Sequence, residues 1–216
     1  MSAEKRIDAL LLDVDGTLWD STPIVSRAWS RAVHEIGYED MVILPDTLKG
    51  LFGKTMDEIA EALLPNAPYE QRQLLMDKCV KYEQEALEGD PCDICYPGVI
   101  DTIKRLSEVL PLAIVSNCQA GYIELFMKKT HLTEREITDR LCFGDSGRGK
   151  AENIRTIVER HGYTSAYYVG DTEGDRIAVR EAGTGFIYAS YGFGKASEAD
   201  ITIDRFSELA KICGCK

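Results

Sequence analysis

Four acidic residues occur in two pairs, each at the end of a predicted strand. Asp13 and Asp15 follow the apolar run at residues 10–12, and Asp171 follows "YYVG", with Asp175 four residues later. Because Asp is disfavoured inside strands, we expect these acids where the strands end, at the edge where open α/β sheets bind ligands. Side chains two positions apart in an extended chain point to the same side. Carboxylates held that close repel each other unless a cation or a proton lies between them.

Three further polar residues occupy comparable positions. Ser116 and Asn117 end the run "AIVSN", and Lys150 opens a predicted helix. A hydroxyl, an amide and an ammonium group can hold phosphate oxygens together with backbone N–H groups. Each residue also has a structural interpretation: a plain turn, a solvated helix residue, or, for Asp171 and Asp175, acids that cap a helix. Their common location at strand ends favours one shared site.

The predicted elements divide the chain into two parts. Residues 18–88 contain no convincing strand, and helical spacing predicts helices at 23–37, 55–64 and 69–87. From residue 89 onward strands and helices alternate, which is typical of a parallel, doubly wound sheet of the α/β class. The strands are predicted at 111–117, 139–145, 165–171, 184–189 and 199–203, and the helices at 98–109, 120–130, 150–162 and 173–183. We therefore expect a core of residues 1–17 and 89–216, interrupted by a helical domain at 18–88.

Composition excludes several classes of protein. The net charge of −11 argues against nucleic-acid binding, which needs clustered Lys and Arg. No export signal or membrane-spanning segment is recognisable, so we expect a cytoplasmic protein that does not contact membranes. The seven cysteines are interpreted as reduced thiols, because their number is odd and no export signal is recognisable. The pairs Cys92/Cys95 and Cys213/Cys215 do not make a zinc signature, which needs two well-spaced pairs.

Taken in order along the chain, these residues resemble the motifs of a known family. The haloacid dehalogenase superfamily has four motifs, which are similar here to Asp13-Val-Asp15-Gly-Thr17, Ser116-Asn117, Lys150 and Gly170-Asp171-x-x-x-Asp175. The resemblance spans nearly the whole chain, and the helical insertion resembles that family's cap domain of the first type. One departure is Ala151, where the family often has Pro after the motif Lys.

The resemblance implies a chemical role for each motif residue. Asp13 would attack phosphorus to form an aspartyl-phosphate, and Asp15 would act as general acid and then general base. Lys150 and Ser116 would bind the transferring phosphoryl oxygens, and Asn117 and Thr17 would assist in binding substrate.

The resemblance also implies a Mg²⁺ ion. Its ligands would be Asp13, the backbone carbonyl of Asp15, and Asp171, with Asp175 holding a metal-bound water or orienting Lys150.

The acid at position 15 narrows the expected reaction. Dehalogenase branches and phosphonate-cleaving relatives lack an acid here, so Asp15 indicates phosphate esters. The resemblance extends to the phosphoglycolate phosphatase and β-phosphoglucomutase branch, helped by the "SYGFG" loop at 190–194. A mutase must hold a second phosphate, yet the loop "GLFGKT" offers only Lys54 and no Arg. We therefore favour a hydrolase of small phosphorylated metabolites, with Lys54 as a substrate-binding residue and the mutase as the alternative.

Two non-enzymatic alternatives come from other classes. "GDSGRGKA" at 144–151 fits a nucleotide-binding P-loop, except that Ala151 replaces the Ser or Thr that binds Mg²⁺. A phospho-receiver module also uses acids, Mg²⁺ and Lys on a doubly wound sheet, but such modules carry no helical insertion of this length. Steady release of phosphate from a simple ester would exclude both.

Overall fold

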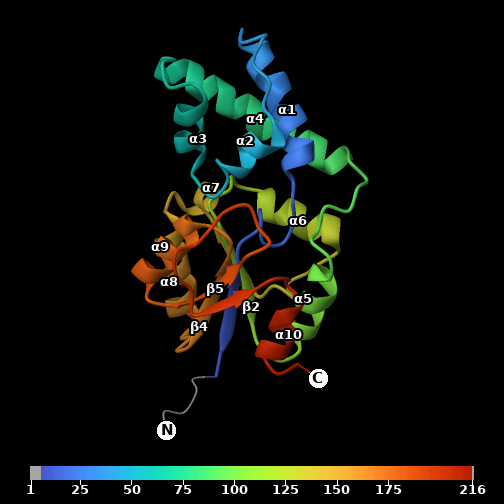
Figure 1. The fold of residues 1–216 in the computed structure, drawn as a ribbon, viewed down its shortest axis with the longest axis vertical. Helices are drawn as coiled ribbons and strands as arrows, with labels where there is room; N and C mark the ends of the chain where they lie inside the picture. The colour runs from blue at the N-terminus through green and yellow to red at the C-terminus, as the bar shows by residue number, and fades with distance from the viewer. Residues whose placement is uncertain (1–5, 216) are drawn as a thin grey trace.

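A six-stranded parallel sheet forms the centre of the computed structural model, which describes residues 6–215 (Figure 1). Its strands lie in the order β3-β2-β1-β4-β5-β6, and every neighbouring pair is parallel. The strands are β1 (Ala9–Leu12), β2 (Leu112–Ser116), β3 (Asp139–Cys142), β4 (Ala166–Gly170), β5 (Gly185–Ala189) and β6 (Ile201–Ile203). This arrangement confirms the predicted α/β class with a parallel, doubly wound sheet.

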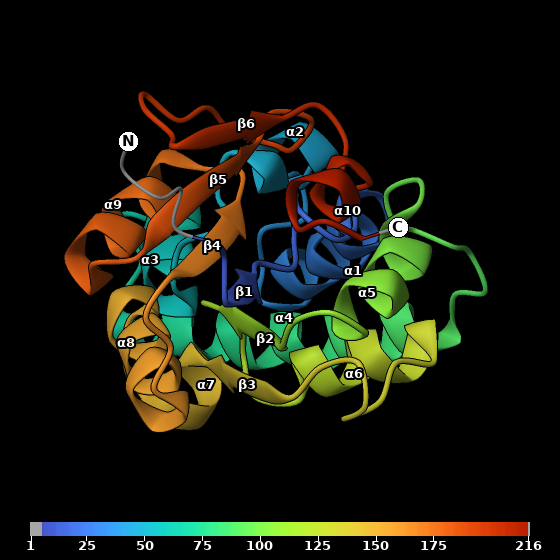
Figure 2. The same cartoon turned by 90° about the horizontal axis from the view of Figure 1, so that it is seen from below.

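Helices cover both faces of the sheet, which explains why β1 is apolar at every position. Leu10 and Leu12 pack into a large cluster on one face, and Leu11 packs into a second cluster on the other. Figure 2 shows α5 and α10 on one side of the sheet and α8 and α9 on the other. The helices that follow β1 in the core are α5 (Val99–Ser107), α6 (Tyr122–Thr130), α7 (Phe143–Ser146), α8 (Lys150–His161), α9 (Glu173–Ala182) and α10 (Glu208–Ile212).

Four helices lie between β1 and α5 in the sequence and stand beyond the carboxyl ends of the strands, at the top of Figure 1. Local signals start two of them: Pro23 lies in the first turn of one, and Thr55 and Glu58 form a reciprocal capping box at another. The four are α1 (Thr22–Glu35), α2 (Pro45–Lys49), α3 (Met56–Leu63) and α4 (Tyr69–Gly89). Residues 18–88 contain no strand, as expected, and the long helices begin and end within two residues of their predicted limits.

The structure corrects the prediction at several short elements. The strand predicted at 139–145 ends at Cys142, and the next four residues form α7. β3 is an edge strand whose pairing with β2 ends at Cys142, so the chain beyond has no ladder to continue. The strand predicted at 199–203 begins only at Ile201. The helices α2 and α10 were not predicted, because five residues are too few to show a helical period.

Two predictions from composition can be compared with the structure. All seven cysteines are free thiols. Among residues 6–215, no helix combines the length and the apolar character needed to cross a bilayer.

Candidate active site

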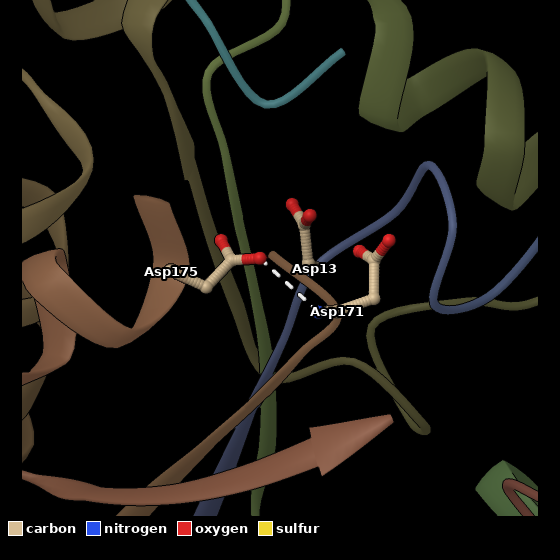
Figure 3. A group of neighbouring side chains, drawn as sticks. All are labelled: Asp13, Asp171 and Asp175. Carbon is tan, nitrogen blue, oxygen red and sulfur yellow. Dashed lines mark hydrogen bonds between the residues drawn. The ribbon is translucent and has the colours of Figure 1, made fainter. Parts of the chain in front are cut away.

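The fold gathers the predicted residues at one edge of the sheet. β1 lies between β2 and β4, so Asp13, Ser116 and Asp171 come from the ends of three adjacent strands. Figure 3 shows Asp13 and Asp171 beside Asp175, which lies in the first turn of α9. One ligand oxygen from each of these three buried carboxylates lies within 4.8 Å of the other two.

Lys150 lies buried among these carboxylates. Its Nζ lies 3.1 Å from Asp13 Oδ1 and 2.5 Å from Asp175 Oδ1. Burial alone would lower the pKa of this ammonium group, but the two carboxylates outweigh burial and hold the pKa above its ordinary value. Lys150 is therefore a fixed positive charge directly behind Asp13.

Asp175 has two structural tasks. Its Oδ2 accepts hydrogen bonds from the backbone N–H of Thr172 (2.9 Å), the hydroxyl of Thr172 (2.7 Å) and the backbone N–H of Asp171 (3.1 Å). Thr172 is the N-cap of α9 and completes a capping box with Asp175. The same side chain therefore caps α9 through one oxygen and contacts Lys150 Nζ through the other.

Burial and mutual repulsion disfavour charge on Asp13 and Asp171. Burial raises the pKa of Asp13 to about 6, Lys150 opposes that rise, and Asp175 adds to it. Burial and the two neighbouring carboxylates raise the pKa of Asp171 well above its ordinary value. Asp13 Oδ1 also has no hydrogen-bond donor, only the ion pair with Lys150. A cation at this point would remove the repulsion and supply the missing interaction.

Two glycines allow the backbone to close around Asp171. Gly16 has a φ of +81°, and a Cβ there would lie 2.3 Å from Asp171 Oδ2. A Cβ on Gly192 would lie 2.2 Å from Asp171 Cβ, and the next residue, Phe193, donates its backbone N–H to Asp171 Oδ2 at 2.7 Å. The "SYGFG" loop thus holds the Asp171 carboxylate in place.

Thr17 occupies a different position from the one expected of a substrate-binding side chain. It is fully buried, and its hydroxyl donates to Asp171 Oδ1 at 3.3 Å. Its side chain belongs with the acid cluster, because the turn after Gly16 directs it toward the end of β4 instead of toward the pocket.

Asp15 is held by three hydrogen bonds to one oxygen. Its Oδ1 accepts from Trp19 Nε1 (3.0 Å), Ser21 Oγ (2.5 Å) and Tyr122 OH (2.9 Å). Burial raises the pKa of Asp15 to about 7, against the effect of these three donors and with a smaller contribution from the Asp13 charge. Asp15 also lines the pocket.

The pocket lies between the sheet edge and the inserted helices. From the core it is lined by Asp13, Asp15, Ser116, Asn117, Cys118, Gln119 and Tyr122, and from the insertion by Trp29, Phe52, Gly53, Lys54, Met56, Ile59 and Glu83. The free volume is about 30 Å³, room for little more than water.

The predicted residues divide into two groups in this pocket. Ser116, Asn117 and Lys54 line it together with the first two acids, whereas Lys150, Asp171 and Asp175 lie behind it. Asn117 Nδ2 donates to the carbonyl of Gly53 at 2.8 Å, which ties the sheet edge to the loop of the insertion. Lys54 is exposed at that loop.

Sequence reasoning missed the side chains that shape the far side of the pocket. Trp29, Glu83, Gln119 and Tyr122 lie in ordinary helical or loop sequence with no motif. No signal in the sequence separates Glu83 from the other acids of its charged helix. Helical spacing alone could have placed Trp29 on the buried face of α1.

The structure does not support the P-loop alternative. Gly144, the first glycine of that motif, lies inside α7, and the motif lysine is held between two carboxylates. A P-loop needs both groups free to enclose a phosphate.

Comparisons with known proteins agree with this geometry. The chain is 26% identical over 224 residues to the phosphoglycolate phosphatase of Aliivibrio fischeri, covering 95% of this chain and 96% of that protein. It is 27% identical to the phosphoglycolate phosphatase of Rhodobacter capsulatus, with 87% and 86% covered.

Solved structures share the fold over nearly the whole length. A predicted phosphoglycolate phosphatase from Haemophilus somnus superposes with a TM-score of 0.82 at 19% identity, covering 97% of this chain and 99% of that one. A haloacid dehalogenase-like hydrolase from Streptococcus pneumoniae gives 0.81 at 20% identity, with 95% and 97% covered. The model of the haloacid dehalogenase-like hydrolase family matches residues 10–189, so the chain belongs to that family.

Proposed function

We propose that this protein is a Mg²⁺-dependent phosphatase that hydrolyses small phosphomonoesters through an aspartyl-phosphate on Asp13. The observation that carries the proposal is the placement of Asp13 and Asp15 in one pocket, with the Lys150 ammonium 3.1 Å behind Asp13. The relatives named phosphoglycolate phosphatases support the same reaction class.

In the first step a carboxylate oxygen of Asp13 attacks phosphorus, and the bond from phosphorus to the ester oxygen breaks. Asp15 in its acid form gives its proton to that departing oxygen, so the product alcohol leaves neutral. The three donors that fix Asp15 Oδ1 support this role, because they hold the side chain of a pocket-lining acid through one oxygen and make no bond to the other. Ser116 lines the pocket beside Asp13 and is placed to bind phosphoryl oxygens.

In the second step Asp15, now ionised, takes a proton from water. The water oxygen attacks phosphorus, the bond from phosphorus to Asp13 breaks, and inorganic phosphate forms while both acids return to their starting states. We propose that Lys150 balances the negative charge of Asp13 and of the bound phosphoryl group, and that Asp175 orients Lys150 through their 2.5 Å contact.

The residues present fit a Mg²⁺ ion. The donor set is oxygen only, the carboxylates repel one another, and Asp13 Oδ1 lacks a hydrogen-bond donor. We propose Asp13, the Asp15 carbonyl and Asp171 as the ligands, and Asp175 as a group that reaches the ion only indirectly, because both of its oxygens already have partners. When bound, the ion would neutralise phosphate charge and hold the ester in line with Asp13.

Removal of divalent metal is expected to abolish phosphatase activity. Added Mg²⁺ should restore it, whereas Ca²⁺ should restore little, because its larger and looser coordination spoils the in-line arrangement. The measurement is phosphate release after chelation and readdition of each ion. Full activity of a metal-free preparation would contradict the proposal.

A panel of phosphorylated metabolites assayed with Mg²⁺ tests the function as a whole. Release of phosphate at a steady rate, with no requirement for a bisphosphate activator, identifies a hydrolase. The alternative, β-phosphoglucomutase-like transfer, needs a second phosphate site, yet among residues 6–215 the pocket is lined by no Arg and by a single exposed Lys.

We further propose that residues 18–88 act as a cap domain that selects the substrate. The core motifs would contact only the phosphoryl group and the metal, which every substrate shares. Selectivity must therefore come from side chains that the insertion places against the leaving group.

Lys54 offers a test of this idea at the rim of the pocket. With 2-phosphoglycolate, Lys54→Ala should lower kcat/KM about tenfold or more, because a charge-assisted hydrogen bond to the carboxylate is lost. With p-nitrophenyl phosphate, which offers Lys54 no anionic partner beyond the phosphoryl group, kcat/KM should change little. Equal losses on both esters would assign Lys54 to the phosphoryl group, and no loss on either would show that it is only a solvated side chain.

A further inference from the structure

Glu83 is a buried carboxyl in the cap wall of the pocket that the proposed chemistry does not use. It comes from α4 and is only 3% exposed. Its Oε2 accepts a hydrogen bond from Trp29 Nε1 at 2.7 Å, and its Oε1 accepts one from Gln119 Nε2 at 3.0 Å. Both of these partners also line the pocket. The Glu83 carboxyl on α4 is thus held by one side chain from α1 and one from the loop after β2.

Within the described part of the chain, no cation forms an ion pair with Glu83. Its hydrogen-bond partners are a neutral indole and a neutral amide, and the charge that acts on it is that of Asp15. Burial raises the pKa of Glu83 to about 8, the two hydrogen bonds oppose that rise, and Asp15 adds to it. A buried carboxyl without a cationic partner is costly, and such groups are found mostly where function requires them.

Charge is distributed unevenly across the part of the pocket that would receive the leaving group. Besides Asp13, the pocket is lined by two acids, Asp15 and Glu83, and by the apolar side chains of Phe52, Met56 and Ile59. Lys54, the lysine among the described residues that line it, is exposed on the loop. A leaving group that enters the pocket therefore meets carboxyl oxygens, and an anionic one would be brought close to two acids without a buried cation to pair with it.

Resting on the proposed phosphatase function, we propose that Glu83 is a specificity residue that selects phosphomonoesters whose leaving group carries a second hydrogen-bond donor. That donor is a hydroxyl or an ammonium group a few atoms from the ester oxygen. A leaving group that carries a carboxylate could pair only with Lys54 at the rim and would be disfavoured by Glu83 in the pocket wall. This chain should therefore prefer a donor ester to 2-phosphoglycolate, unlike the phosphatases whose names specify phosphoglycolate.

Glu83 can accept such a donor whether it is protonated or ionised. The Trp29 indole only donates and keeps one oxygen as an acceptor, while the Gln119 amide can turn to present either its N–H₂ or its carbonyl oxygen. A neutral alcohol would use an acceptor lone pair of Glu83, and an ammonium group would additionally favour the ionised form.

The test compares four short esters with the full-length protein and Mg²⁺. They are 2-hydroxyethyl phosphate, 2-aminoethyl phosphate, n-propyl phosphate and 2-phosphoglycolate, which have similar size but present a hydroxyl, an ammonium, a methyl and a carboxylate group. We expect kcat/KM for at least one of the two donor esters to exceed that for 2-phosphoglycolate by about tenfold or more, as for one hydrogen bond lost and one repulsion gained. The first two esters show whether the selected donor is a hydroxyl or an ammonium.

Glu83→Gln then tests the residue itself. Gln keeps the shape and can still bond Trp29 and Gln119, but it carries no charge, so the ratio between the donor esters and 2-phosphoglycolate should shrink about tenfold. If the selected donor is an ammonium group, that ester should lose the most. Glu85→Gln is the matched control, because Glu85 lies on the same helix with a half-exposed side chain near Lys81, and its ratio should equal that of the wild type.

p-Nitrophenyl phosphate separates failure of this inference from failure of the phosphatase function. If the protein hydrolyses none of the esters in the presence of Mg²⁺, the proposed phosphatase function is wrong. Two results would overturn the role of Glu83 while the phosphatase function stands. One is hydrolysis of p-nitrophenyl phosphate together with a preference for 2-phosphoglycolate over the donor esters. The other is an unchanged kcat/KM ratio between the donor esters and 2-phosphoglycolate in Glu83→Gln. A uniform loss on all five esters in Glu83→Gln would also overturn it, since that is the result expected of a merely structural residue.

Discussion

Asp13→Asn is expected to abolish turnover, with a loss in kcat of at least about 10³-fold, the scale seen when a nucleophile is removed from a covalent mechanism. Asn has nearly the same shape but is a far weaker nucleophile than a carboxylate. The substitution also removes one oxygen of the acid cluster that we propose as the metal site. The measurements are steady-state phosphate release and mass spectrometry of the protein after brief exposure to substrate. The wild type should carry one additional phosphoryl group, and the variant none.

The folded state of this variant should be intact, which separates lost chemistry from lost structure. Asp13 has its pKa raised to about 6 in the folded protein, against 3.8 ordinarily. Between these values the folded state binds more protons than the unfolded state, so ionisation of Asp13 makes unfolding easier as pH rises. Asn cannot ionise, so the metal-free variant should be at least as stable as the metal-free wild type at pH 8 by thermal unfolding. Near-native hydrolysis by a folded Asp13→Asn protein would contradict covalent catalysis.

Asp15→Asn should produce the second largest loss, and the loss should depend on the leaving group. General acid–base assistance is worth ~10²–10⁴-fold, so kcat for an alkyl ester should fall within that range. With p-nitrophenyl phosphate the first step should suffer much less, because nitrophenolate departs without a proton. The second step still needs a base, so phosphorylated protein should accumulate with this ester.

The structure makes Asn a clean replacement at this position. Its carbonyl oxygen can accept the same three hydrogen bonds from Trp19, Ser21 and Tyr122, which keeps the side chain in place. Rapid quenching followed by mass spectrometry measures the accumulated intermediate. An alkyl-ester rate within threefold of the wild type, or equal losses on alkyl and aryl esters with no accumulation, would show that Asp15 does not transfer the proton.

The class of fold and the order of its long elements follow from local patterns. The buried run at 10–12 needs apolar side chains on both faces of a parallel sheet, and α1, α8 and α9 show helical spacing with Pro, Gly or a capping box at their ends. These signals depend on neighbours within about one helical turn, so a single sequence reveals them. Short elements such as α2 and α10 depend on packing, and no local pattern marks them.

The acids of the site could be expected from sequence for a different reason. Asp13 and Asp171 directly follow apolar strands, and the carboxyl ends of parallel strands lie at one edge of the sheet. Which strands are adjacent is decided only in three dimensions, where β1 lies between β2 and β4 and the acids become neighbours.

Tertiary structure alone decided how each of these groups is used. Thr17 turns its hydroxyl to Asp171 because Gly16 adopts a positive φ, and the SYGFG loop closes on the same carboxylate where a Cβ would not fit. Glu83 lies 36 residues from Gln119 in the sequence, yet their side chains meet across the boundary between the insertion and the core. Such contacts join segments whose separation carries no periodic signal, and their energy comes from burial that exists only after the chain has folded. The side of the pocket formed by the sheet edge can therefore be predicted from motifs, whereas the side formed by the insertion is set by how the inserted helices pack over the sheet.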